Sequence, residues 1–227
     1  MTQSSLKDDV ALAIARAEAV MQAGTRTVVG VAGPPASGKS TLAELMVETV
    51  NQSQSGPVPR AVLLPMDGYH LDNRILESRG LLARKGAPET FDAAGFCDAV
   101  AAVKSAARMT YHPKFDRQMD LAIANAVAIH PETPLVVVEG NYLLLQDDPW
   151  ARLGALFDLT VFVSPSRDDL KKRLQQRWLT HGLDAEAALA RATSNDLPNA
   201  DRILRDSAKA DLHLSQDYSE FGVRYAF

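Results

Sequence analysis

The segment that most constrains this chain is the octapeptide Gly33–Ser40, which reads GPPASGKS and follows the apolar run Thr27–Ala32. It matches the pattern G-x-x-x-x-G-K-[ST] of a P-loop, also called the Walker A motif. The β-branched run before it predicts a buried parallel strand, and residues 38–50 are predicted to form a helix. A strand that turns into a helix through this motif is the context that a phosphate-binding loop requires, because the backbone N–H groups then face the anion.

The loop and the first turn of the helix supply the predicted nucleotide-binding residues. We expect the Lys39 ammonium group to reach the β- and γ-phosphates of ATP and to act in catalysis, and the Ser40 hydroxyl to ligate Mg²⁺. The predicted nucleotide-binding residues of this segment are Gly33, Pro34, Pro35, Ala36, Ser37, Gly38, Lys39, Ser40 and Thr41.

Two further apolar runs each lead into a carboxylate. Leu135–Val138 is followed by Glu139, and Ala61–Leu64 is followed three residues later by Asp67. The carboxyl ends of parallel strands meet at one edge of a sheet, where α/β proteins bind ligands. Glu139 is therefore the predicted metal ligand beside Ser40. Asp67 is predicted to be the catalytic base for an acceptor hydroxyl, with a role as a metal ligand left open.

The rest of the chain alternates helical and strand patterns. Residues 5–22, 92–108, 167–180 and 184–194 are predicted helices, the first capped by Ser4 or Ser5, while 160–163 and 212–214 are predicted strands. Alternation of this kind indicates an α/β fold, a P-loop NTPase fold with a mostly parallel sheet and helices on both faces. With 227 residues, the chain is expected to form a single domain, 1–227. Strand order does not follow from the sequence.

Composition excludes several classes of function. Hydrophobic residues make up 46% and charged residues 23% of the chain, and the net charge is −4. This balance argues against a sequence-independent nucleic-acid binder, and the single cysteine, Cys97, excludes an internal disulfide. No apolar run reaches the ~18 residues of a membrane helix. The N-terminus lacks a signal peptide pattern, so we expect a cytoplasmic protein.

A basic cluster near the C-terminal third predicts a helical lid over about 167–199. Arg173 and Arg177 are four residues apart and therefore lie on one helix face. There a guanidinium group can stabilise charge on the transferring phosphoryl group. We assign Arg173 a catalytic role and Arg177 a role in nucleotide binding. A solvated basic helix is the alternative interpretation.

Four short segments, taken in order, resemble a known family. They are Gly33–Thr41, Met66–His70 (MDGYH), Lys85–Asp92 (KGAPETFD) and Val138–Tyr142 (VEGNY). Together they resemble the phosphoribulokinase/uridine kinase-like superfamily of P-loop kinases. Within it the chain looks most similar to the putative fructose transport system kinase group, which shows strings like Asn195–Asn199 (NDLPN), and KGAPETFD is similar to a string of bacterial pantothenate kinases. The resemblance implies ATP, Mg²⁺ and transfer to a small-molecule hydroxyl. It also implies that Asp67 is the catalytic carboxylate, Glu139 the second acidic site, and Arg173 and Arg177 the lid arginines.

Two insertions, 67–91 and 110–120, are expected to form the acceptor site. Their polar side chains suit a hydroxyl-rich acceptor. The predicted substrate-binding residues are Tyr69, His70, Lys85, Tyr111, His112, Arg117 and Asn141. The sequence thus predicts a kinase for a small metabolite, a sugar or sugar derivative, and the resemblance implies the fructose type and a role in carbohydrate metabolism. A pantothenate- or nucleoside-type kinase and a non-catalytic ATP-binding sensor stay open as alternatives, and so does a homodimer.

Overall fold

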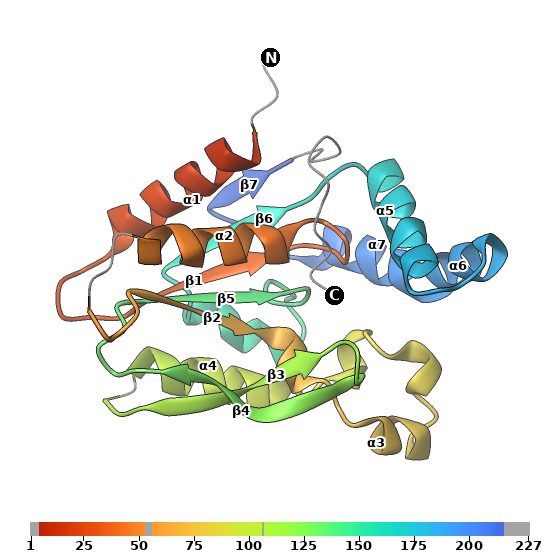
Figure 1. Ribbon diagram of the computed structural model, residues 1–227, viewed down its shortest axis with the longest axis horizontal. Coiled ribbons are helices and arrows are strands. Elements are labelled where there is room, and N and C mark those ends of the chain that lie inside the picture. Colours follow the sequence, from red (N-terminus) through yellow and green to blue (C-terminus); the bar gives the residue numbers. More distant parts are fainter. Residues whose placement is uncertain (1–4, 53–55, 106, 216–227) are drawn as a thin grey trace.

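The computed structural model describes residues 5–52, 56–105 and 107–215 (Figure 1). The strands are β1 (Thr27–Ala32), β2 (Ala61–Pro65), β3 (Thr110–Asp116), β4 (Leu121–Ile129), β5 (Leu135–Gly140), β6 (Leu159–Val163) and β7 (Leu212–Leu214). The α-helices are α1 (Leu6–Val20), α2 (Lys39–Gln52), α3 (Asn73–Ser78), α4 (Ala93–Ser105), α5 (Arg167–Thr180), α6 (Ala185–Arg191) and α7 (Leu197–Asp206). Four short 3₁₀ helices and one π-helix join them: η1 (Met66–Tyr69), η2 (Leu82–Arg84), η3 (Pro88–Thr90), η4 (Trp150–Ala155) and the π-helix η5 (Ala192–Asp196).

Five parallel strands form the main sheet in the order β2-β5-β1-β6-β7. The strand that precedes the P-loop is in the middle, and β5 pairs with it from Thr27↔Leu135 to Ala32↔Gly140. On the other side of β5, β2 pairs as far as Pro65↔Glu139. The P-loop, Glu139 and the residues that follow β2 therefore emerge at the same edge of the sheet.

Helices cover both faces of this sheet, as the alternation of the sequence predicted (Figure 1). Along β1, Val29 and Val31 belong to the apolar cluster beneath α1 and α2. Val28 and Ala32 face the opposite cluster, to which α4 and η4 contribute. All of these side chains are buried, which is typical of a parallel strand covered on two sides. The predicted α/β class of a P-loop NTPase is confirmed.

The predicted helices are all present, and their ends differ from the prediction by a few residues. Ser5 is the N-cap of α1: its hydroxyl accepts from the Asp8 backbone N–H at 3.2 Å, and the Asp8 carboxylate accepts from Ser5 in return. This reciprocal arrangement is a capping box. Ser4, the other predicted cap, lies outside the described residues.

Three elements differ from the sequence prediction. Residues 67–91 are not an irregular loop, because η1, α3, η2 and η3 occupy most of them. Residues 110–120 are the first strand and turn of an antiparallel hairpin whose second strand, β4, was not predicted. The chain also continues from η5 directly into α7. Pro198 lies in the first turn of α7, directly after the π-helix. None of the described helices is long and apolar enough to cross a membrane.

Candidate active site

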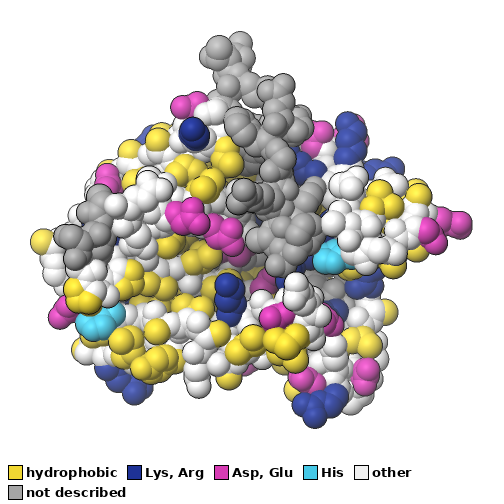
Figure 2. All heavy atoms as spheres, viewed as in Figure 1, with side chains coloured by type: hydrophobic (Ala, Val, Ile, Leu, Met, Phe, Trp, Pro, Cys, Tyr) yellow, Lys and Arg dark blue, Asp and Glu magenta, His cyan; other side chains and the backbone are white. Residues whose placement is uncertain are grey.

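A cleft of about 1000 Å³ opens at the carboxyl edge of the sheet. The P-loop, the end of β5, segment 67–91, the β3–β4 hairpin and the predicted lid 167–199 all contribute lining residues. In the space-filling view, acidic and basic side chains gather around the hollow in the middle of the face (Figure 2). The cleft thus joins the predicted phosphate site to the predicted acceptor segments.

The P-loop adopts the tight conformation that its glycines permit. A Cβ at Gly33 would lie 2.3 Å from the Val163 carbonyl oxygen, so only glycine fits between the loop and the end of β6. Gly38 has φ +96°, a value that L side chains rarely adopt. Six of the predicted residues line the cleft: Pro35, Ala36, Gly38, Lys39, Ser40 and Thr41. Gly33, Pro34 and Ser37 do not; they shape the loop, and the Ser37 hydroxyl accepts from the Lys39 N–H at 3.4 Å.

Glu139 lies directly beside the P-loop. The Ser40 hydroxyl donates to Glu139 Oε1 at 3.0 Å, and Lys39 Nζ lies 3.3 Å from the same oxygen. Both charged side chains of this ion pair are about nine-tenths buried. A hydroxyl and a carboxylate oxygen at one point are ligands that suit Mg²⁺, which binds few protein groups and takes its remaining ligands from phosphates and water. Ser40 and Glu139 therefore fit the predicted metal.

Asp67 follows β2 in the 3₁₀ helix η1 and faces the same cleft. Its carboxylate accepts from the Arg117 guanidinium of the hairpin at 2.8 Å. Burial favours the neutral acid, but Arg117 and His70, which is protonated in the acidic range where an aspartate titrates, lower the pKa of Asp67 below its ordinary value. The carboxylate is therefore ionised at neutral pH, as a group that accepts a hydroxyl proton must be.

A backbone contact fixes the position of η1. A Cβ at Gly68 would lie 2.3 Å from the Pro113 carbonyl oxygen of β3. The two backbones can touch only because residue 68 has no side chain. This contact holds Asp67, the preceding residue, against the hairpin that supplies Arg117.

Arg173 of α5 contacts the P-loop. Arg173 Nη1 donates to the carbonyl oxygens of Ala36 at 3.5 Å and of Ser37 at 3.4 Å. Arg177 lines the cleft, and its charge contributes to lowering the pKa of Asp67. Below these residues Leu174, Ala192 and Leu197 form a small apolar cluster, against which Ala36 and Trp178 pack. The predicted lid thus touches the phosphate loop through both polar and apolar contacts.

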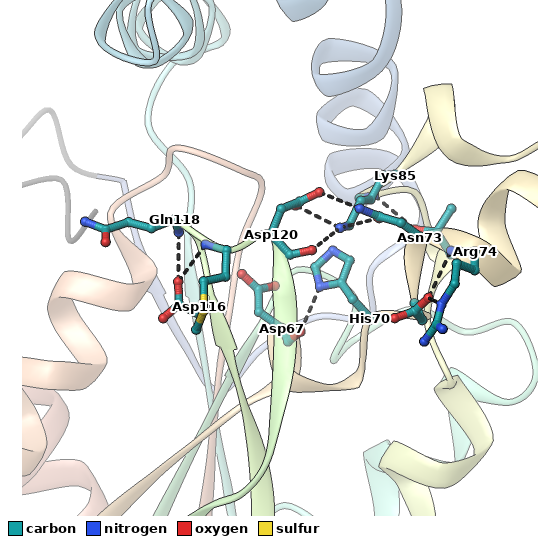
Figure 3. A network of polar contacts seen from close by, with 12 residues as sticks. Asp67, His70, Asn73, Arg74, Lys85, Asp116, Gln118 and Asp120 are labelled. Atoms are coloured by element: carbon teal, nitrogen blue, oxygen red, sulfur yellow. Dashed lines mark hydrogen bonds and ion pairs between the residues drawn. The ribbon is translucent and has the colours of Figure 1, made fainter.

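At the far end of the cleft, Lys85 is the centre of a polar network (Figure 3). Lys85 Nζ lies 2.8 Å from Asp120 Oδ1 and donates to Asn73 Oδ1 at 2.7 Å and to the Asp120 carbonyl at 2.9 Å. Beside it, His70 Nδ1 donates to the Asp67 carbonyl at 2.8 Å. Burial lowers the pKa of His70, so the ring is neutral at pH 7.

Three predicted substrate-binding residues lie outside the cleft lining. Tyr111 is 59% exposed on the hairpin. His112 is buried and lies 3.1 Å from the Tyr69 hydroxyl, with Thr110 on its other nitrogen, and Tyr69 packs edge-on against Phe96 of the core. On β3, Tyr111 and His112 precede a register shift between His112 and Lys114. The residues after this shift, Lys114, Phe115, Asp116 and Arg117, do line the cleft.

The other four predicted substrate-binding residues line the cleft. Asn141, which follows β5, lines the cleft, and its Oδ1 is buried without a hydrogen-bond partner. Such an acceptor is available to a hydroxyl of a bound molecule. His70, Lys85 and Arg117 also line the cleft.

Several cleft residues were missed by sequence reasoning. Glu44 is four residues after Ser40 and so lies on the same face of α2; burial and the charge of Glu139 raise its pKa. Trp178 donates through Nε1 to Asp196 Oδ2 at 2.6 Å, and burial raises the pKa of this aspartate. The spacing of four residues between Ser40 and Glu44 could have predicted that Glu44 faces the cleft. Asp196 lies within the string NDLPN, to which no role was assigned.

The loop, the carboxylate beside it and the cleft beyond them define a nucleotide-binding P-loop protein of the kinase type. The model of the "Phosphoribulokinase / Uridine kinase family" matches residues 28–215. The chain therefore belongs to the phosphoribulokinase/uridine kinase family of P-loop kinases, as its motifs suggested.

Solved and curated relatives agree with this assignment. The crystal structure of a putative fructose transport system kinase from Silicibacter sp. TM1040 is 42% identical, with a TM-score of 0.83, and the match covers 90% of this chain and 98% of that one. The uncharacterized protein YggC of Escherichia coli is 37% identical over 82% of this chain and 76% of its own. The putative uridine kinase C227.14 of Schizosaccharomyces pombe is 30% identical over 88% of each chain. The pantothenate kinase of Leifsonia xyli is 37% identical, but the match spans about half of its length, 48%.

Proposed function

We propose that this protein is an ATP- and Mg²⁺-dependent kinase that transfers the γ-phosphoryl group to a hydroxyl of a small metabolite, a sugar or sugar derivative. The observation that carries the proposal is the position of Asp67. It follows β2, whose neighbour β5 carries Glu139 beside the P-loop. Asp67 therefore stands where the phosphate end and the acceptor end of one cleft meet.

Each group has a role that its geometry supports. Lys39 holds the β- and γ-phosphates, and Ser40 with Glu139 holds Mg²⁺, which neutralises charge on the phosphates when bound. Asp67 orients the acceptor hydroxyl and receives its proton. The acceptor oxygen forms a bond to the γ-phosphorus as the bond from that phosphorus to the bridging oxygen of ADP breaks. Arg173 stabilises the charge on the group in transfer.

The acceptor end favours a neutral molecule rich in hydroxyl groups. Arg117 is paired with Asp67 at 2.8 Å, and Lys85 with Asp120 at 2.8 Å. To bind Arg117 or Lys85, an anionic acceptor such as a sugar phosphate or pantothenate would have to displace a carboxylate; Lys114 of β3 is a further cation that lines the cleft. A neutral polyol meets no such cost, and the open acceptor oxygen of Asn141 and the carboxylate of Asp120 can both receive its hydroxyls. The fructose-type kinase named among the relatives fits this chemistry.

Acceptor-dependent ADP release tests the proposal. The panel should contain D-fructose and other neutral sugars, sugar phosphates, D-glycerate, pantothenate and uridine. We expect at least one neutral sugar to raise ADP release well above the rate with water alone. Asp67→Asn should abolish this stimulation while nucleotide affinity changes little. Asp98→Asn is the matched control, because Asp98 lies in α4, outside the cleft lining, and pairs with Arg152.

The alternatives predict different results. Stimulation by pantothenate or uridine alone would identify one of the other acceptor types. Tight binding of ATP without stimulation by any hydroxyl compound would identify a non-catalytic ATP sensor, in which nucleotide binding changes a conformation that a partner reads.

A further inference from the structure

Two hydrogen bonds tie the predicted lid directly to the acceptor segment. Arg191 Nη1, at the end of α6, donates to the Ala83 carbonyl at 2.9 Å. Asn195 Nδ2, in the π-helix η5, donates to the Lys85 carbonyl at 3.0 Å. Both acceptors are main-chain atoms of the short stretch 83–85, more than 100 residues away in the sequence. The proposed kinase function assigns no role to Asn195.

Asn195 lies on an element that packs against the phosphate loop. Its side chain is 2% exposed. It lies on the same π-helix as Ala192, which packs with Leu174 and Leu197 against Ala36 of the P-loop. A π-helical turn carries an extra residue and occurs frequently at functional sites. The π-helix therefore carries both the residue that packs against the P-loop and Asn195.

The stretch that Asn195 contacts organises the acceptor end. The Gly86 carbonyl, next in the chain, accepts from the Tyr142 hydroxyl at 2.5 Å. Two side chains from different elements thus hold the main chain at 85–86. The Lys85 ammonium group in turn holds Asn73 and Asp120 in place at the far end of the cleft (Figure 3).

The amide of Asn195 is only half satisfied. Its Oδ1 is buried without a hydrogen-bond partner. A buried acceptor left unpaired costs on the order of 1–3 kcal/mol. The bond from Nδ2 to the Lys85 carbonyl is the interaction that only an amide donor supplies here.

We propose that Asn195 is a positioning residue that couples the lid to the acceptor end. By fixing the main chain at Lys85, it makes two changes occur together: the lid packs on the nucleotide, and Lys85, Asn73 and Asp120 become ordered. This inference rests on the proposed function, because it concerns the acceptor end of the same cleft. Coupling of this kind is reciprocal, so a bound acceptor would also tighten nucleotide binding.

Hydrogen–deuterium exchange tests the coupling without knowledge of the acceptor. The probe is AMP-PNP, a non-hydrolysable ATP analogue, with Mg²⁺, and exchange is compared at the amides of 33–41 and of 81–87. We expect the analogue to slow exchange at both segments in the wild-type protein. In Asn195→Asp, which keeps the size but replaces the donor by a second acceptor facing the Lys85 carbonyl, 33–41 should remain protected. The protection of 81–87 should fall by fivefold or more.

Two further variants make the test specific. Asn195→Ala removes the donor without adding a charge and should give the same pattern. Thr193→Ala is the matched control in the same π-helix, because the Thr193 hydroxyl donates only to Leu189 and Ala190 within the helix. In Thr193→Ala the analogue should still slow exchange at both segments, 33–41 and 81–87. Urea unfolding midpoints verify that each variant is folded.

Every result decides between coupling and a purely structural role. Full protection of 81–87 in either Asn195 variant would overturn the inference, as would a wild-type protein in which the analogue protects 33–41 but leaves 81–87 unchanged. If neither variant folds, the wild-type comparison alone decides. A failure of the analogue to protect 33–41 would contradict nucleotide binding itself, and so the proposed function. With the acceptor identified, Asn195→Asp should raise its KM about tenfold with a smaller change in kcat.

Discussion

Arg117 of the hairpin and Asp67 of η1 form an ion pair of 2.8 Å across the cleft. Because the pair joins two segments that are separated by 50 residues, it sets both the position and the charge of the proposed base. Burial raises the pKa of Asp67, and the neighbouring cations, Arg117 among them, more than compensate for this effect.

The pair predicts how the activity depends on pH. Asp67 acts as a carboxylate, so activity is lost as the pH falls through its pKa. Without the Arg117 charge that pKa rises, so in Arg117→Met the acidic limb of the kcat/KM profile should move to higher pH. Arg117→Lys keeps the charge and should leave the limb near its wild-type position. An unchanged limb in Arg117→Met would show that another group titrates there.

The Ser40–Glu139 contact predicts a variant with a weakened metal site. Ser40→Ala removes one of the two proposed protein ligands, so the Mg²⁺ concentration for half-maximal activity should rise about tenfold, since the loss of one charge-assisted contact is on the order of 1.5 kcal/mol. Saturating Mg²⁺ should restore part of the activity. Titration of ADP release with Mg²⁺ measures this change. Glu48→Gln, on an exposed position of the same helix, should leave the titration unaltered.

The contact between Arg173 and the P-loop carbonyls predicts a loss of turnover. Arg173→Met should lower kcat on the order of 100-fold or more, because an arginine that stabilises the transferring phosphoryl group contributes at least that much in related chemistry. Binding of the ATP analogue should weaken far less. Lys172 is the neighbouring cation with a side chain that is 79% exposed; Lys172→Met should retain near wild-type kcat. Equal losses in both variants would indicate a general effect of charge on α5.

The close approach of η1 and β3 predicts a glycine that cannot be replaced. Gly68→Ala would place a Cβ 2.3 Å from the Pro113 carbonyl oxygen. The two backbones would have to separate, at a cost of about 1–3 kcal/mol in the free energy of unfolding, and Asp67 would move with η1. Both the free energy of unfolding, measured with urea, and kcat should decline. Gly154→Ala is the control, because no atom lies within 4 Å of a Cβ built there and its φ is unexceptional.

Sequence reasoning located the phosphate end of the cleft better than the acceptor end. The P-loop and Glu139 were predictable because local patterns determine them: a strand, a motif of fixed spacing and a strand followed by a carboxylate. Strand order was not predictable, since pairing joins residues more than 100 positions apart, as in Thr27↔Leu135. The β4 strand was missed because its residues 121–126 are all exposed, although most are apolar, so no alternation of polar and apolar residues marks them as a half-buried strand.

Side-chain direction was the second source of error. Tyr111 and His112 were grouped with Arg117 because they are close in sequence. Within a strand, however, neighbouring residues point to opposite sides, and a register shift between His112 and Lys114 alters the pattern again. The contacts of Asn195 and Arg191 with 83–85 depend on how the lid packs, and no local sequence pattern predicts them.

The pairing of β2 with β5 has a consequence for how such kinases diversify. The chain leaves the sheet after Pro65 and re-enters it at Leu135, in the strand that pairs with β2. Within this stretch α4 belongs to the core, but segment 67–91 and the β3–β4 hairpin line the cleft and can change in length and chemistry while the framework that binds the triphosphate stays as it is. Evolution could exchange one alcohol substrate for another by changing these cleft-lining segments alone. A chimera that carries the segments of a relative would reproduce such a change in the laboratory.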